Sequence, residues 1–273
     1  MNRLFLTLVL MLTAVFGLEA QNSCFPLSGD IPFKAGEKIK MGMYYKWGAV
    51  NTEVATGELS LSESALNGKS VFKTTLTAET APFFSVFYDM HEHFDTWFEK
   101  DAVRPLKYYR NTKQGDYRAF NNYIYDWSRR VIHADINYGG RGQQVLDIPI
   151  HDCVCDITSI LYLIRTMDFE AVKEGQKIPI SFAIDDTVFD ILLTYRGRET
   201  VKVKRMGKVR CQKFACSVVS GALFDGKTDM LIWFSDDSNH LPVGFMAPLK
   251  IGSAQGWLKQ AQDLKYPFDA REK

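Results

Sequence analysis

The segment 39–78 reads IKMGMYYKWGAVNTEVATGELSLSESALNGKSVFKTTLTA, and its apolar residues recur mostly at every second position. Successive side chains of a β-strand point to opposite faces, so this period of two is typical of strands with one buried face. Asn67-Gly68 is a strong hairpin-turn signal between two such strands. A change of phase at Gly57 predicts a bulge or a bend. The segment therefore predicts an antiparallel meander.

The same alternation covers most of the remaining chain, where turn residues separate short strand-like stretches. These stretches are 91–99, 104–109, 117–125, 129–133, 178–184, 189–195, 201–203, 209–211 and 230–234, with Gly207 between the two short ones. The segment 154–167 differs, because its apolar residues recur at spacings of three and four, which predicts a helix over about 152–168 with Asp152 as its cap. We therefore expect a β-dominated α+β fold, with a large curved antiparallel sheet or incomplete β-barrel around one main helix.

The N-terminus has the order of a secretion signal: one arginine, an apolar run from Leu4 to Leu18, and the small residue Ala20. The run is shorter than the roughly 20 residues that a membrane span needs. We expect a signal-peptide helix over residues 1–20, cleavage after Ala20, and export. An uncleaved anchor is one alternative. Lipidation at Cys24 is another, although Gln21 and Asn22 do not suit a lipidation site.

The rest of the chain is expected to comprise a flexible segment (21–32), a single curved-sheet domain (33–264) and a C-terminal tail (265–273). The formal net charge is +1, with basic and acidic residues interleaved, which argues against a nucleic-acid surface. The spacings of the cysteines do not match the C-x-x-C pattern that holds zinc. We expect buried thiols, with a long-range disulfide as the alternative. The five cysteines are Cys24, Cys153, Cys155, Cys211 and Cys216.

Several short motifs occur in a fixed order along the chain. They are Phe33-x-x-Gly36-Glu37, then Asp156, Leu161, Tyr162 and Arg165, then Trp233-Phe234-Ser235-Asp236-Asp237, Leu241-Pro242-Val243 and Ile251-Gly252-Ser253. In combination these motifs resemble the bacterial envelope family named domain of unknown function 3108, over about Phe33 to Leu264. The resemblance implies a β protein in the periplasm or on the periplasmic face of the outer membrane, without an established activity. By fold analogy, it also suggests a sheet curved like that of lipoprotein carriers.

One strand-like stretch carries candidate metal ligands. His91, His93 and Asp95 alternate, so their side chains are expected to share one face, where two imidazoles and a carboxylate could hold a divalent metal. A solvated strand face is the simpler interpretation, and no H-E-x-x-H pattern accompanies the three residues. Neither a nucleophile motif nor a phosphate-binding loop is convincing in this sequence. We therefore expect no enzyme activity, no cofactor and no catalytic residues, and a metal-dependent hydrolase is the least favoured function.

An excess of aromatic residues between 83 and 98 suggests binding of a hydrophobic molecule. Such clusters usually form core, but in a curled sheet they could line a groove for a lipid or acyl chain. The candidate groove residues are Phe83, Phe84, Phe87, Tyr88, Trp97 and Phe98. The favoured function is thus a non-enzymatic binding protein for a hydrophobic envelope ligand. The alternative is an envelope assembly or scaffold protein that binds proteins or glycans through exposed tyrosines. Those tyrosines are Tyr108, Tyr109, Tyr117, Tyr123 and Tyr125.

Overall fold

The computed structural model describes residues 30–151, 153–218, 229–249 and 251–272. The expected signal peptide, its cleavage site, Cys24 and Asp152 lie outside these residues. The two helices of the described chain are α2 (Pro82–Ser85) and α3 (Ser159–Arg165). Its strands are β1 (Lys38–Trp47), β2 (Val50–Leu66), β3 (Lys69–Thr80), β4 (Met90–Phe98), β5 (Pro105–Gln114), β6 (Tyr117–Asp126), β7 (Val131–Tyr138), β8 (Gln143–Pro149), β9 (Val154–Cys155), β10 (Lys177–Ile184), β11 (Thr187–Val203), β12 (Gly207–Val218), β13 (Met230–Ser235), β14 (Pro242–Pro248) and β15 (Ser253–Gln262).

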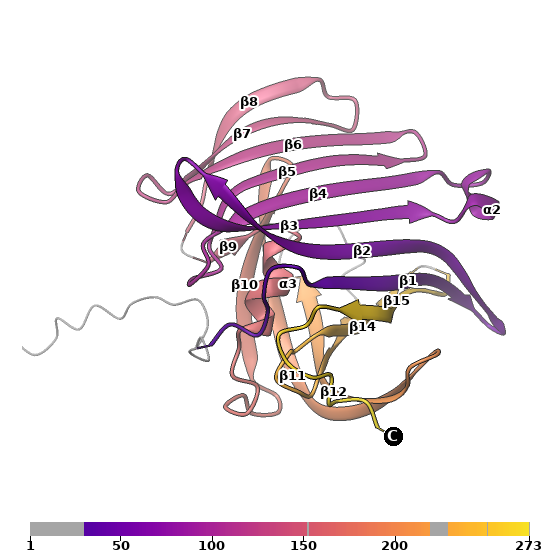
Figure 1. Ribbon diagram of the computed structural model, residues 1–273. Helices are drawn as coiled ribbons and strands as arrows, with labels where there is room; N and C mark the ends of the chain where they lie inside the picture. The colour runs from indigo at the N-terminus through magenta and orange to yellow at the C-terminus, as the bar shows by residue number, and fades with distance from the viewer. Residues whose placement is uncertain (1–29, 152, 219–228, 250, 273) are drawn as a thin grey trace, which may run out of the picture.

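All these strands belong to one 15-stranded sheet, in the order β8-β7-β6-β5-β4-β3-β2-β1-β15-β14-β13-β12-β11-β10-β9. Each strand pairs antiparallel with its neighbours, except that β9 and β10 are parallel. The sheet curves around α3 (Figure 1), and its end strands β8 and β9 do not pair, so it is not closed into a barrel. The expected β-dominated fold, a large curved sheet with one main helix, is confirmed.

The meander of β1, β2 and β3 follows the alternation in the sequence. Asn67 and Gly68 both have positive φ, 51° and 77°, as a tight hairpin turn between β2 and β3 requires. The irregularity in β2 lies at Val54, not at Gly57 as predicted, because Met43 pairs with Ala55 and Tyr44 with Glu53. The backbone carbonyl of Val54 instead accepts a hydrogen bond from the Ala81 amide (2.8 Å), just before α2.

The helix expected over 152–168 is much shorter, since α3 contains only Ser159–Arg165. Val154 and Cys155 supplied the start of the apolar pattern, but they form β9, which pairs with Ser181 and Phe182 of β10. Asp156 terminates this strand, and its Oδ1 accepts hydrogen bonds from the backbone amides of Thr158 (3.0 Å) and Ser159 (2.9 Å). The helix therefore begins after Asp156. In the described part of the chain, no helix is long and apolar enough to cross a membrane.

The concave face of the sheet is filled by side chains. One buried cluster packs α3 against the strands from β1 to β4, from β10 to β13 and β15, through residues such as Phe33, Phe98, Tyr162 and Phe214. A second cluster fills the space inside β4 to β8. The five tyrosines expected to be exposed are not: Tyr108, Tyr123 and Tyr125 are buried members of this second cluster, and Tyr109 and Tyr117 are half-buried. Alternation along β6 placed Tyr123 and Tyr125 on the inner face.

Candidate functional site

The exposed large hydrophobic side chains are concentrated at one end of the sheet. The described chain exposes ten of them, and eight lie on hairpin tips at that end. We call these eight the apolar rim: Trp47, Val50, Phe83, Val86, Phe87, Tyr88, Leu249 and Ile251. The rings of Phe83 and Phe87 are the most exposed aromatics, at 76% and 80% of their full accessibility. Folding leaves this apolar surface in water, where burying it against another apolar body would be favourable.

Three hairpin tips carry the rim, at β1–β2, β3–β4 and β14–β15. The Tyr45 hydroxyl donates a hydrogen bond to the Ile251 carbonyl (3.1 Å), which joins the first tip to the third. Gly252, with φ +76°, lies so close to the Lys46 carbonyl that a Cβ there would come within 2.3 Å of it. The tip with α2 lies at the same end of the sheet as the β1–β2 tip (Figure 1). The turns at the opposite end are polar, as at Asn67-Gly68 and Lys100-Asp101.

The structure separates the six residues predicted to line a groove. Phe83, Phe87 and Tyr88 belong to the rim, and Phe84 lies beside them with its ring 5.1 Å from that of Phe83. Phe98 lies at the other end of β4, fully buried, with its ring 5.5 Å from that of Tyr162.

Trp97 lies on the opposite face of β4 from Phe98, where Lys73 Nζ and Lys107 Nζ approach its ring centroid to 4.8 and 5.0 Å. The six side chains therefore do not line one groove. The four residues from 83 to 88 do form an exposed apolar surface.

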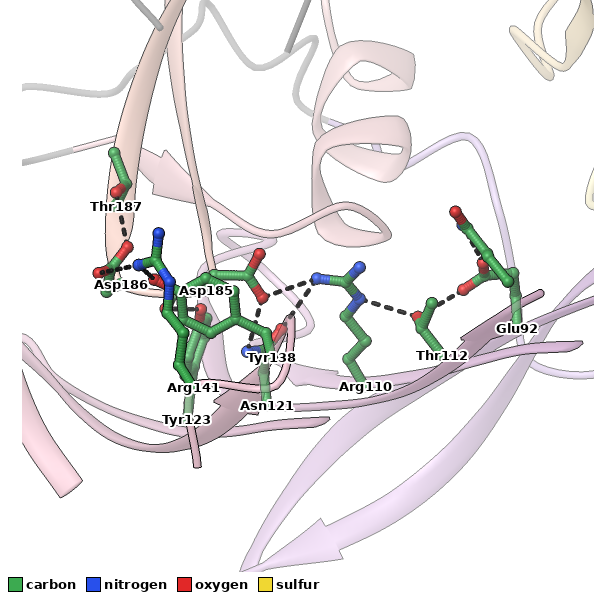
Figure 2. Close-up of polar contacts among 11 residues, drawn as sticks. Glu92, Arg110, Thr112, Asn121, Tyr123, Tyr138, Arg141, Asp185, Asp186 and Thr187 are labelled. Carbon is green, nitrogen blue, oxygen red and sulfur yellow. Dashed lines mark hydrogen bonds and ion pairs between the residues drawn. The ribbon is translucent and has the colours of Figure 1, made fainter. Parts of the chain in front are cut away.

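A network of polar side chains lies on the inner face of β4 to β7 and on the β10–β11 turn (Figure 2). We call it the polar belt: Glu92, Arg110, Thr112, Gln114, Asn121, Tyr123, Tyr138, Arg141, Asp185 and Asp186. Glu92, on β4, accepts hydrogen bonds from the Thr112 hydroxyl (2.5 Å) and the Gln114 amide. The buried Arg110 donates from Nε to the Thr112 hydroxyl (2.9 Å). Its Nη1 donates to Asn121 Oδ1 (3.2 Å) and Asp185 Oδ1 (2.9 Å).

The polar belt joins two parts of the sheet that are far apart in strand order. Asp185 lies on the turn between β10 and β11, and its partners come from β5 and β6. The Tyr123 hydroxyl donates to the Asp185 carbonyl (2.5 Å), and burial raises the pKa of this tyrosine well above its usual value. A hydrogen bond from Tyr138 holds the pKa of Asp186 below its usual value. Side chains thus connect the β10–β11 turn to the inner face of β5 and β6.

Sequence reasoning missed this belt. It predicted only a turn between the stretches 178–184 and 189–195, and it gave no role to Glu92 or Arg110. The alternation of β4 and β5 was a usable signal, because it places Glu92 and Arg110 on the face that also carries Phe94 and Tyr108. A charged residue on a buried face implies a partner, although the partner here is 75 residues away.

The candidate metal ligands share one face of β4, as expected, but do not converge. His91 Nε2 lies 2.9 Å from Asp89 Oδ1, and His93 Nε2 lies 3.1 Å from Asp95 Oδ2. Asp95 also pairs with Lys73 Nζ (3.0 Å) and accepts a hydrogen bond from the Thr75 hydroxyl (2.5 Å). No group of three histidine, cysteine or acidic side chains that could hold a metal occurs among the described residues.

The recognised sequence motifs meet in the core. Arg165 of α3 forms two contacts with Glu37, Nη1 to Oε1 at 2.6 Å and Nη2 to Oε2 at 2.8 Å, and both side chains are fully buried. The Arg165 guanidinium also lies over the rings of Phe33 and Tyr162, at 5.1 and 5.2 Å from their centroids. These motif residues therefore hold the helix to the N-terminal segment and do not form an open site.

The cysteines differ among themselves. Cys155, Cys211 and Cys216 are free and buried, as expected of structural thiols. Burial raises the pKa of Cys211 to about 12 and that of Cys216 to about 11. Cys153 is disulfide-bonded, so for this residue the alternative of a bridge is the correct one.

Comparisons with known proteins place the chain among uncharacterised families. The family described as "Protein of unknown function (DUF3108)" matches residues 40–259. None of the curated proteins matches the sequence.

Among solved structures, a β-barrel-like protein of the domain of unknown function DUF1849 from Brucella abortus is similar over 85% of this chain and 98% of its own. Its TM-score is 0.54 at 10% identity, which shows a shared fold. A protein from Bacteroides fragilis NCTC 9343, described as exported with a YmcC-like fold, covers the same shares of the two chains at 12% identity with a TM-score of 0.33. A lipoprotein from Parabacteroides distasonis ATCC 8503 covers 85% of this chain and 100% of its own at 11% identity, with a TM-score of 0.32.

Proposed function

The chain belongs to the DUF3108 family of proteins of unknown function, and on that premise we propose that it is a non-enzymatic binding protein of the cell envelope that attaches to a lipid surface through its apolar rim. The observation that carries the proposal is that, of the ten large hydrophobic side chains exposed among the described residues, eight lie at one end of the sheet. Scattered exposed hydrophobics are normal on a protein surface, whereas a concentrated patch marks an interaction site.

The residue types of the rim suit the boundary between water and lipid. Phe83, Val86 and Phe87 are wholly apolar and protrude around α2, whereas Trp47 and Tyr88 combine an apolar ring with a polar group. Tryptophan and tyrosine favour the membrane interface because the ring enters the apolar layer while the polar group stays hydrated. The rim can therefore insert a few side chains without carrying backbone into the hydrocarbon layer.

The arrangement of the rim favours a lipid surface over a protein partner. A stable protein interface buries about 800 Å² on each side around a contiguous core. The rim residues are divided among three hairpin tips instead. A bilayer adapts to separate protrusions, and binding then increases with the apolar area inserted.

The proposal places the hydrophobic contact at the rim because core clusters occupy the concave face. Phe98 and Tyr162 fill the space near α3, and Tyr108 and Tyr123 fill the space inside β4 to β8. An acyl chain held inside the sheet would have to displace such residues. Export, expected from residues 1–20, and the family resemblance support a location at an envelope membrane.

Vesicle flotation with the purified protein tests this function. Complete burial of a phenylalanine side chain contributes about 1.5–3 kcal/mol, so the double variant Phe83→Ala/Phe87→Ala should lose roughly 2–4 kcal/mol of membrane affinity. That loss lowers the vesicle-bound fraction at least tenfold below saturation, since about 1.4 kcal/mol is a factor of ten. The matched control is Ile124→Ala/Val145→Ala, which removes the two exposed hydrophobics outside the rim.

The two double variants should unfold at the same temperature as the parent, since all four side chains are exposed. Equal flotation of the rim variant and the control variant would contradict the proposal, as would an absence of flotation of the parent protein.

A further inference from the structure

In the part of the chain that the structure describes, the two exposed large hydrophobics outside the rim lie near an open edge of the sheet. β8 is the terminal strand of the 15-stranded order, and among the described residues it pairs only with β7. Val145, in the middle of β8, is 81% exposed, and Ile124 lies two strands away on the same face. A terminal strand presents unpaired backbone groups to solvent, and proteins usually shield such edges. Here a seven-residue strand with an exposed valine ends the sheet.

The register of β8 identifies the backbone groups that face outward. The Ile150 amide donates to the Arg130 carbonyl (2.9 Å), so these two residues form a hydrogen-bonded antiparallel pair. Hydrogen-bonded and non-hydrogen-bonded pairs alternate along such a ladder. Val145, which pairs with Asp135, therefore directs its N–H and C=O away from β7, as do Gln143 and Asp147. The backbone of Pro149 also faces away from β7, but proline has no N–H to donate, so Asp147 is the last outward-facing donor of β8.

A shallow pocket of about 600 Å³ lies beside this edge, on the outer face of β6, β7 and β8. Its side chains include Ile124, Val145, His133, Asp135 and Asp147. Asp135 accepts a hydrogen bond from Gln143 (2.8 Å) and has no lysine or arginine partner among the residues described.

Asp147 lies 2.6 Å from His133 Nδ1 and 3.9 Å from Arg129 Nη2. The outer face of the edge thus carries apolar side chains and two carboxylates, and Asp135 is the one without a lysine or arginine neighbour among the residues described. On the inner face, Leu146 and Ile148 pack against the second core cluster and give the edge an apolar side.

We propose that β8 receives an extended strand from a partner protein, with lysine or arginine on the outer face of the added strand and apolar side chains on its inner face. The backbone of Gln143, Val145 and Asp147 would hold the strand by main-chain hydrogen bonds, as in other cases of strand addition. A basic side chain then meets Asp135, and apolar ones extend the row of Leu146 and Ile148. A second copy of this chain is a poorer occupant, because it would bring its own carboxylates to the same place.

A peptide-binding measurement tests the inference, with a fluorescent eight-residue peptide of alternating valine and lysine as the probe. Its anisotropy should rise on titration with the purified protein, whereas the matching valine–glutamate peptide should bind at least tenfold more weakly. The variant Val145→Pro removes an outward N–H without touching the ladder to β7, and should weaken binding at least tenfold. That loss is expected because one hydrogen bond is worth close to a factor of ten. The control variant Val145→Thr keeps the N–H, so it should bind within about threefold of the parent.

Four results would overturn the inference: no binding of the valine–lysine peptide, equal binding of the two peptides, unchanged binding by Val145→Pro, or a loss by Val145→Thr as large as that by Val145→Pro. Amide exchange of the free protein gives a fifth test. Fast exchange at Val145 is expected of an open edge, and strong protection there would show that the edge is already covered.

Discussion

Replacing Arg165 by methionine tests whether the buried ion pair with Glu37 holds the helix to the rest of the fold. Both side chains are 0% exposed, and two nitrogen–oxygen contacts of 2.6 and 2.8 Å join them. Arg165 also donates to the carbonyls of Asn239 (3.2 Å) and Pro32 (3.4 Å). Methionine has a similar length and fills the same space, so the variant removes charge and hydrogen bonds more than volume.

The expected cost follows from the charge that remains. Breaking a buried pair from one side costs about 3–5 kcal/mol, because the other charge stays buried without compensation. This is a large part of the roughly 5–15 kcal/mol by which a domain is stable. The double variant Glu37→Gln/Arg165→Met removes the uncompensated carboxylate, and it should recover at least about 1 kcal/mol of the loss.

Urea unfolding followed by tryptophan fluorescence measures these free energies. The control is Arg104→Met, which breaks an exposed pair with Glu99 (2.9 Å) and should cost less than about 1 kcal/mol. A cost for Arg165→Met no larger than that of Arg104→Met would refute the reasoning. So would a double variant that is less stable than Arg165→Met, because the remaining charge would then not be the cause.

Three further predictions concern the polar belt, the acid range and the thiols. Arg110→Met should lower the free energy of unfolding by about 2–3 kcal/mol, since Asp185 and Asn121 lose a charged donor; a change below about 0.5 kcal/mol in a urea titration would contradict this. Burial opposes ionisation of Asp95, but hydrogen bonds from Thr75, His93 and Lys73 hold the pKa of this carboxyl below the usual value. The contribution of Asp95 to stability is therefore present above about pH 3.9, and it is lost as the pH falls through the lowered pKa. The stability difference between the parent and Asp95→Asn should therefore shrink on acidification below about pH 5, and a difference that grows would exclude the assignment. Burial raises the pKa values of the three free thiols, so these thiols stay protonated at pH 7.5. Mass spectrometry should therefore find them unlabelled by a thiol reagent until the protein unfolds. Rapid labelling of the folded protein would be inconsistent with their burial. These thiols are Cys155, Cys211 and Cys216.

The sheet could be predicted from the sequence because alternation is a local property of a strand. Ile39 is buried on β1, and Asn67-Gly68 forms the predicted turn. The pairing of β1 with β15 could not be predicted, since the register from Lys38–Gln262 to Lys46–Ser253 joins residues more than 200 positions apart. Alternation also does not say which face is buried. The tyrosines of β5 and β6 were therefore expected at the surface, although Tyr108 and Tyr123 lie in the core.

The helix was overestimated for a physical reason. Apolar residues at spacings of three and four occur from Val154 to Met167. Val154 and Cys155 instead form β9, which pairs in parallel with β10, and Asp156 ends this strand. Tertiary pairing thus outweighed the local periodicity.

Only some residues of the apolar rim could be selected from the sequence. Phe83, Phe87 and Tyr88 were selected because they cluster along the chain. Trp47 and Ile251 were not, because they come together only through the long-range pairing of β1 with β15, which ends at Lys46 and Ser253. Each is an ordinary exposed hydrophobic by itself. The rim exists because antiparallel pairing brings three hairpin tips to one end of the sheet.

The central claim is that the rim is the surface that meets lipid, and amide hydrogen exchange of the unaltered protein with and without phospholipid vesicles tests it most directly. Vesicles should slow exchange in the residues around α2 and at the β1–β2 tip, from 83 to 88 and from 47 to 51, and leave the Asn67-Gly68 turn at the opposite end unchanged. Slower exchange at Asn67-Gly68, or no difference at the rim under conditions in which the protein floats with vesicles, would contradict the account.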